Sequence, residues 1–192
     1  MPRITIKHRF TQATIFECEA EDLRDAVVKA VAGRASLAGA SLAGANLTGA
    51  SLAMANLSGA NLAGADLAMA DLTGADLTPI RDDIWAVLSA SPSEVDGLRA
   101  AIAEGRIDGT TYSGECACLV GTIANLHHCD EYSLPILKPN SSRPAERFFL
   151  AIRLGDTPKT SQFSALALEW VDQWLASMRA AFGQPATMTV AS

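Results

Sequence analysis

The sequence predicts a mixed β and α fold. We expect a short four-sided coil of about two turns, covered at its front by a strand and a helix and followed by a mainly helical C-terminal domain. Residues 35–78 repeat one five-residue pattern nine times without a break, whereas almost all aromatic residues lie outside this segment. The repeats and the flanking segments must therefore pack in different ways. We predict three units, residues 1–32, 33–79 and 80–192.

Each repeat reads Ala-(Ser/Asn/Asp)-Leu-x-x, with a leucine at its centre: Leu37, Leu42, Leu47, Leu52, Leu57, Leu62, Leu67, Leu72 and Leu77. A period of five matches neither the α-helical period of about 3.6 nor the strand period of 2. The chain must instead turn a corner once per repeat, so that four repeats close one square turn of about 20 residues. The leucine and the alanine two positions earlier then point inward, and the polar residue between them points to water.

This pattern resembles the pentapeptide-repeat family, whose fold is a right-handed quadrilateral β-helix. The resemblance covers residues 35–78 and implies a β-helix of about two coils. Most copies end in glycine, which suits a turn: Gly39, Gly44, Gly49, Gly59, Gly64 and Gly74. A repeat block placed before a helical domain is similar to bacterial and phage-associated proteins.

Both ends of such a coil expose leucines and unpaired backbone groups, so each end needs a cover. At the front, residues 13–18 read as a strand and residues 21–32 as a helix that lies across the first turn. Behind the repeats, Pro79 stops the pattern. A helical stripe then follows, formed by Ile80, Ile84, Trp85 and Leu88.

Further helices are expected in the C-terminal half. Ser91 and Glu94 form a capping box before an apolar pattern that stops at Gly105, and residues 143–154 form a second candidate opened by Ser142. The longest pattern runs over residues 162–182 and ends at Gly183. Its two tryptophans, Trp170 and Trp174, are interpreted as core residues rather than as a cofactor site.

Composition and charge exclude several classes of function. The formal net charge is −6 and no basic patch stands out, so we expect no direct binding of nucleic acid. The N-terminus lacks the apolar core of a signal peptide, and polar residues interrupt the repeats too often for a membrane span. We therefore expect a cytoplasmic protein without membrane association, whose four cysteines are free thiols or ligands.

A cluster of cysteines and histidines is the main candidate for chemistry. Cys116, Cys118, His127 (or His128) and Cys129 offer four ligands of the kind that zinc prefers. Their spacing is tighter than in ordinary zinc motifs, and a helix over residues 116–126 would hold Cys116 and His127 about 16 Å apart. A zinc site and a helix here exclude each other.

Two other interpretations of this cluster stay open. Cys116 in the first turn of a helix would be a candidate reactive thiol, although no histidine of the cluster would then reach it. Alternatively, the cysteines are small buried apolar residues and the histidines lie at the end of a helix.

The leading functional hypothesis is a non-enzymatic interaction or scaffold module that binds a protein partner or a second copy of itself. No catalytic or cofactor-binding residues are assigned. The first alternative is a metal-binding or thiol-dependent activity at the cysteine and histidine cluster. The second follows from the resemblance, because some pentapeptide-repeat proteins modulate DNA gyrase by imitating duplex DNA. Here Asp66, Asp71 and Asp76 fall on successive sides of the coil, so they predict part of a ring and not an acidic stripe.

Overall fold

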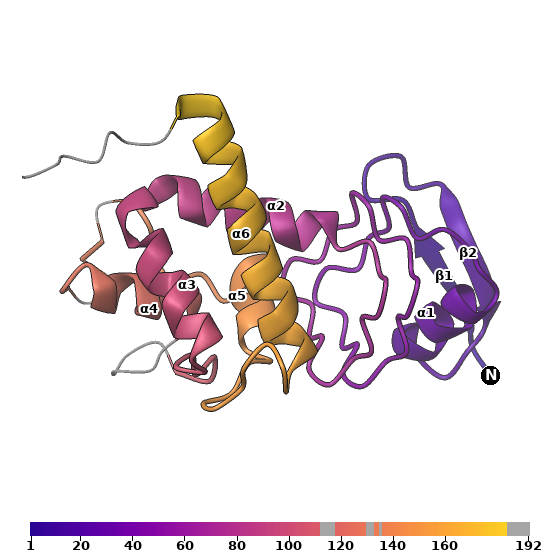
Figure 1. The fold of residues 1–192 in the computed structure, drawn as a ribbon. Coiled ribbons are helices and arrows are strands. Elements are labelled where there is room, and N and C mark those ends of the chain that lie inside the picture. Colours follow the sequence, from indigo (N-terminus) through magenta and orange to yellow (C-terminus); the bar gives the residue numbers. More distant parts are fainter. Residues whose placement is uncertain (112–117, 130–132, 135, 184–192) are drawn as a thin grey trace, which may run out of the picture.

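The structure is a computed structural model that describes residues 1–111, 118–129, 133–134 and 136–183. It is a mixed α and β fold in which the repeats lie between a small N-terminal unit and a group of helices (Figure 1). Among the described residues, no helix is long and apolar enough to cross a membrane.

The N-terminal unit consists of an antiparallel pair of strands, β1 (Arg3–Lys7) and β2 (Thr14–Glu19), and the helix α1 (Leu23–Ala32). β2 and α1 agree with the sequence-based expectation, whereas β1 was not predicted. The Asp22 side chain caps α1 by accepting a hydrogen bond from the N–H of Asp25. The buried face of α1 belongs to the same apolar core as the repeats and contains Ala26, Val27 and Ala30.

The repeats wind so that residues twenty positions apart lie side by side. Four isolated parallel bridges record this spacing: Ser41 with Asn61, Asn46 with Asp66, Ser51 with Asp71 and Asn56 with Asp76. All nine leucines are buried, as predicted. The pairing defines four stacks of repeats. Stack 1 contains 35–39, 55–59 and 75–79; stack 2 contains 40–44 and 60–64; stack 3 contains 45–49 and 65–69; stack 4 contains 50–54 and 70–74.

The assigned sheet of the described chain has only the two strands β1 and β2. The repeats themselves are assigned as turns and isolated bridges, so a continuous β-helix of two coils is not assigned. The expected conformation at the corners is present. The glycines that end the repeats have positive φ angles between 63° and 70°.

The C-terminal region is helical, as expected. Its elements are α2 (Thr78–Ala90), the short 3-10 helix η1 (Pro92–Glu94), α3 (Val95–Ala103), α4 (Leu119–Leu126), α5 (Pro144–Phe149) and α6 (Gln162–Phe182). α6 packs against α2 and α3. Trp170 and Trp174 on α6 are buried, and the Trp170 ring lies 5.1 Å from that of Phe148. The two tryptophans are therefore core residues, as interpreted from the sequence.

Two helix boundaries differ from the sequence-based expectation. The Ser91 side chain makes no cap hydrogen bond, and the Glu94 carboxylate contacts His127 instead of completing a capping box. The helix expected over residues 143–154 begins at Pro144 and already ends at Phe149. Local sequence signals were overridden here by contacts with distant segments.

One turn of four repeats forms one layer of the coil. The C-terminal helices cover the last layer through hydrogen bonds from their side chains. The N–H of Leu72 donates to Gln162 Oε1 at 3.0 Å, and Gln162 Nε2 donates to the C=O of Ala70 at 2.7 Å. The side-chain amide of Gln162 therefore occupies the place that a peptide group of a further layer would take. Arg147 adds a bond of 3.2 Å from its Nε to the C=O of Ala65.

The N-terminal unit closes the first layer in a similar way. The N–H of Arg9 donates to the C=O of Gly39 at 2.8 Å, and the N–H of Ser41 donates to the C=O of Lys7 at 2.8 Å. Arg24 Nη2 donates to the C=O of Gly49 at 3.4 Å. Three of the four stacks thus form a hydrogen bond with the N-terminal unit.

Candidate interaction surface and the cysteine and histidine residues

Two methionines occupy corner positions at which most repeats carry glycine. Met54 and Met69 have φ angles of 62° and 58°, and their relative exposures are 78% and 82%. An L residue in this left-handed region costs about 1–2 kcal/mol relative to the right-handed one. Exposing a large apolar side chain adds no compensating burial. Neither methionine is thus explained by stability of the fold.

The two methionines lie on either side of stack 4. Met69 ends the repeat before 70–74, and Met54 ends the repeat 50–54 of the layer below. The Met54 sulfur covers the open side of Gly74, since a Cβ added to this glycine would lie 2.5 Å from it. Stack 4 and its two methionines form a continuous outer surface, which we call the methionine face.

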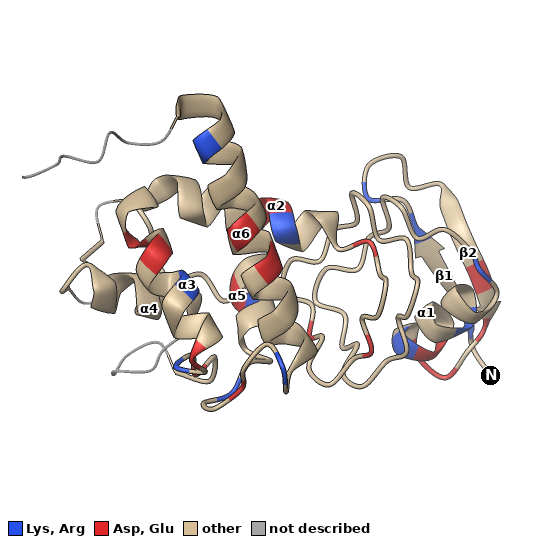
Figure 2. Ribbon diagram, viewed as in Figure 1, with Lys and Arg blue, Asp and Glu red and all other residues tan. Residues whose placement is uncertain are grey.

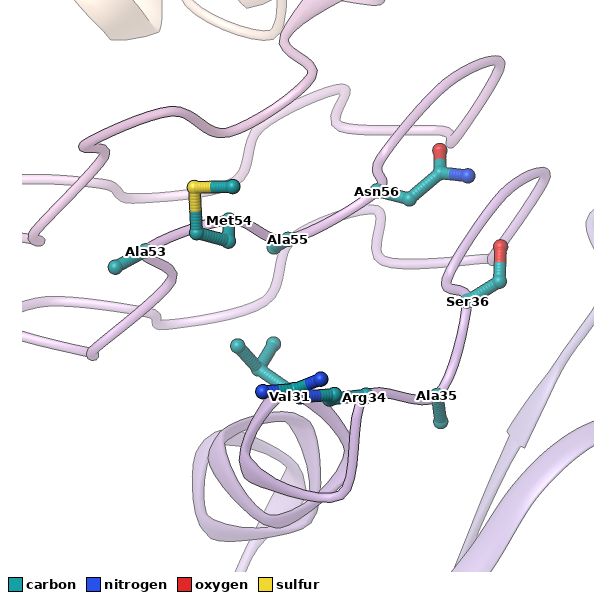
Figure 3. A pocket seen from close by; sticks show the side chains of 8 residues that line it. All are labelled: Val31, Arg34, Ala35, Ser36, Ala53, Met54, Ala55 and Asn56. Atoms are coloured by element: carbon teal, nitrogen blue, oxygen red, sulfur yellow. The ribbon is translucent and has the colours of Figure 1, made fainter.

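A cleft of about 510 Å³ opens below Met54, between the end of α1 and residues 53–56 of the repeats (Figure 3). Its lining residues are Val31, Arg34, Ala35, Ser36, Ala53, Met54, Ala55 and Asn56. The Arg34 side chain lies along the helix beside Val31, and Met54 stands on the opposite wall. The cleft combines apolar walls with one charged group at its rim.

Cys118 lies at the N-terminal end of α4 and is fully buried. Burial raises the pKa of the Cys118 thiol to about 12, and the neighbouring Glu146 carboxyl adds to the shift. The thiol therefore keeps its proton at neutral pH. This protonation state opposes a role of Cys118 as a nucleophile.

Glu146 on α5 is a buried acid with an exposure of only 1%. Its Oε1 accepts a hydrogen bond of 3.3 Å from the N–H of Val120, and within the described chain its Oε2 has no hydrogen-bond partner. Burial raises the pKa of Glu146, against smaller opposing effects of its contacts with Cys118 and Val120.

His127 and Cys129 lie beyond the opposite end of α4. His127 Nδ1 is 2.8 Å from Glu94 Oε1, and Cys129 is half-buried. The eight residues of α4 place about 12 Å of helix between Cys118 and this pair. The structure therefore brings His127 and Cys129 to one end of α4 and Cys118 to the other.

The fourth candidate ligand, Cys116, lies outside the described residues. Within the ranges that are described, no group of three histidine, cysteine or acidic side chains could hold a metal ion. The zinc site over Cys116, Cys118, His127 and Cys129 stays a prediction, and so does a reactive thiol at Cys116. The helical spacing of Cys118 and His127 agrees with the interpretation of the cluster as structural.

The acidic residues of the repeats are distributed around the stacks. Asp66, Asp71 and Asp76 lie on stacks 3, 4 and 1, and each is bridged to a neutral Asn or Ser of the layer below. Asp66 is also 3.6 Å from Arg147. The three carboxylates are part of a ring and form no stripe along the stacks.

Comparison with known protein families identifies the repeated segment. A profile of pentapeptide repeats matches residues 40–78 in eight copies. The segment is therefore an array of pentapeptide repeats. The match begins one repeat after Ala35, where the pattern starts in the sequence. No curated protein and no solved structure matches the chain.

The methionine face was missed in the sequence, although a signal was present. Met54 and Met69 interrupt a column of glycines in the aligned repeats, and such an interruption at a turn position predicts either strain or function. The cleft had no comparable signal, because it depends on the path of the chain between α1 and the first repeat.

Proposed function

We propose that this protein is a non-enzymatic protein-interaction module that presents the methionine face to a protein partner. The observation that carries this proposal is the placement of Met54 and Met69, each strained at a corner and more than three-quarters exposed. Methionine is flexible and polarisable, so it suits surfaces that adapt to a partner. Strained residues persist where function maintains them.

We infer that the stacks form a short right-handed quadrilateral β-helix that acts as a rigid support for this surface. The parallel bridges at twenty-residue spacing and the buried leucines support this inference. A rigid support lowers the entropy that is lost on binding, because the contacting side chains are already held in place.

The charge distribution favours a protein partner over a nucleic acid. Figure 2 shows acidic and basic residues interspersed on the helices and on the N-terminal unit. Several of the basic residues are already engaged with acids, for example Arg99 with Asp172 and Arg143 with Asp83. A surface of this kind offers little neutralisation of phosphates.

Photocrosslinking tests the proposal. The protein is produced in its native host with photo-methionine, irradiated and analysed for covalent adducts. We expect a discrete adduct with a partner protein, and we expect the double variant Met54→Gly, Met69→Gly to lose it. A control variant, Leu154→Ser, removes another exposed apolar side chain and should keep the adduct.

The folded state of the double variant is checked by circular dichroism, and glycine is compatible with both corners. A folded double variant that forms the same adduct as the unchanged protein would contradict the proposal. So would a host in which irradiation yields no adduct at either methionine.

A further inference from the structure

The regular hydrogen bonding between stacked repeats is interrupted at the cleft. From Asn61 onward, the N–H of the residue before leucine donates to the C=O of an alanine in the layer below. These bonds join Asn61 to Ala40, Asp66 to Ala45, Asp71 to Ala50 and Asp76 to Ala55, with lengths of 2.8–3.0 Å. The equivalent bond from Asn56 to Ala35 is not formed. In the part of the chain that the structure describes, neither of these two groups has another hydrogen-bond partner.

A second hydrogen bond between the stacked repeats is missing beside the first. The carbonyl groups equivalent to that of Ala53 each accept a hydrogen bond from a corner residue below; for example, Thr73 accepts from Met54 at 2.8 Å. The corner residue below Ala53 is Arg34, whose N–H donates to Val31 at the end of α1 instead. The C=O of Ala53 is therefore without a partner among the described residues.

The cause of the interruption is the departure of the chain toward α1. Ser36 and Asn56 are still stacked, but the two segments diverge from there toward Arg34 and Met54 (Figure 3). The side chains of Ser36 and Asn56 point away from the opening. The groups left free along the cleft are thus backbone groups, one donor and two acceptors.

A free positive charge lies at the same place. Arg34 is exposed, and it forms no ion pair or side-chain hydrogen bond with any described residue. A guanidinium group binds a carboxylate through two parallel hydrogen bonds. The apolar side chain of Val31 faces the opening, whereas the Met54 side chain is turned away from it toward Gly74.

We propose that this cleft binds an extended peptide segment of a partner protein, with an acidic side chain at Arg34 and an apolar side chain against Val31. This inference rests on the proposed function and specifies the form of the partner. The backbone of an extended segment supplies the acceptor that Asn56 lacks and the donors that Ala35 and Ala53 lack. Such addition of a strand to an open edge is a general mode of peptide recognition.

Selection from a phage-displayed library of random heptapeptides tests the proposal on the full-length protein. The heptapeptides are held between fixed flanking residues, so that they carry no free terminus. We expect enriched sequences to contain Asp or Glu next to an apolar residue. A synthetic peptide of an enriched sequence should slow the hydrogen exchange of the Asn56 N–H by about tenfold or more on binding, since this N–H then has a hydrogen-bond acceptor.

Two arginine variants localise the binding. Arg34→Gln should weaken the enriched peptide by about tenfold or more, because a charge-assisted pair is lost. Arg24→Gln is the matched control, since Arg24 bonds to Gly49 on the neighbouring stack, and it should leave the affinity nearly unchanged. No enrichment over background, or peptides that bind Arg34→Gln equally well, would overturn the proposal. Self-association that protects the Asn56 N–H without any peptide would assign the cleft to a second copy and overturn it as well.

The outcome separates this inference from the proposed function. Met69 lies outside the cleft lining, whereas Arg34 lies outside the methionine face. Loss of the crosslinked partner in Met69→Gly but not in Arg34→Gln would leave the interaction module standing and refute the peptide cleft. Loss neither in Arg34→Gln nor in the double variant Met54→Gly, Met69→Gly would refute both.

Discussion

The corner at Met69 is expected to be more stable with glycine. Replacing Met69 should raise the free energy of unfolding by about 1 kcal/mol, because glycine relieves the positive φ angle and the exposed side chain contributes little packing. Urea unfolding followed by circular dichroism measures the change.

The neighbouring Ala68→Gly variant is the control for this substitution. Ala68 does not have a positive φ angle, so glycine should lower the free energy of unfolding there by about 0.5–1 kcal/mol. Equal effects of the two substitutions would show that the corner is not strained.

The buried carboxyl of Glu146 is expected to make stability depend on pH. Because burial raises its pKa above the ordinary value of 4.5, the folded state binds the proton more tightly than the unfolded chain does. The stabilising contribution is complete below 4.5 and is lost as the pH rises through the folded-state pKa. Urea unfolding across pH 4–8 should therefore show a falling contribution from this group.

Glu146→Gln isolates this effect. Glutamine keeps an oxygen acceptor for the N–H of Val120 but cannot ionise. The difference between the two proteins should grow in favour of the variant as the pH increases. A difference that does not depend on pH would mean that Glu146 titrates at an ordinary pKa.

Gln162 contributes two hydrogen bonds to the attachment of α6 to the repeats. Gln162→Leu removes both hydrogen bonds to Leu72 and Ala70, and it should lower the free energy of unfolding by about 1–3 kcal/mol, since it leaves two backbone groups unpaired. Faster hydrogen exchange of the Leu72 N–H would locate the effect.

Gln162→Glu provides a sharper comparison. A carboxylate still accepts from the N–H of Leu72 but places a negative oxygen against the C=O of Ala70. This variant should regain stability at low pH, when the carboxyl becomes a donor. If both variants were as stable as the unchanged protein, the amide would not be what closes the last layer.

The sequence predicted the elements whose pattern is set by local packing. The leucine period predicted the stacked repeats. The apolar spacing predicted α1 and α6 with nearly correct bounds, and the stripe from Ile80 to Leu88 predicted α2. β1 was missed because its short alternation gives little signal before its partner strand is known. The capping box at Ser91 and Glu94 did not form, since His127, distant in sequence, engages the carboxylate.

The candidate surfaces were harder to predict from the sequence than the helices and repeats. Met54 and Met69 are visible as exceptions to the glycine column, but their exposure follows only from the structure. Gln162 is an ordinary residue at the start of a helix until its contacts with the repeats are known. The open hydrogen bonds at Asn56 depend on the direction in which the chain leaves α1, which no residue pattern encodes.

The repeats and the helices are expected to unfold together. The buried residues of both form one apolar core. Leu57→Ala, in the middle layer, should lower the free energy of unfolding by about 2–5 kcal/mol, because it leaves a cavity. All three tryptophans lie in α2 and α6, so tryptophan fluorescence reports on the helices alone.

The measurement is the urea midpoint seen by fluorescence and by circular dichroism. Both midpoints should shift by the same amount in Leu57→Ala if the chain is one cooperative unit. A fluorescence midpoint that stays fixed would show that the helices unfold independently of the repeats.

The stacking of repeats four apart has a geometric consequence for how the molecule can change in evolution. Inserting four repeats adds one full turn to the coil and returns the chain to the same stack. The helices then keep their orientation relative to β1 and β2. Inserting a single repeat moves the exit to the next stack and swings the helices by a quarter of a revolution. Length in this protein is therefore quantised, and copy number adjusts both the separation and the angular setting of its two ends.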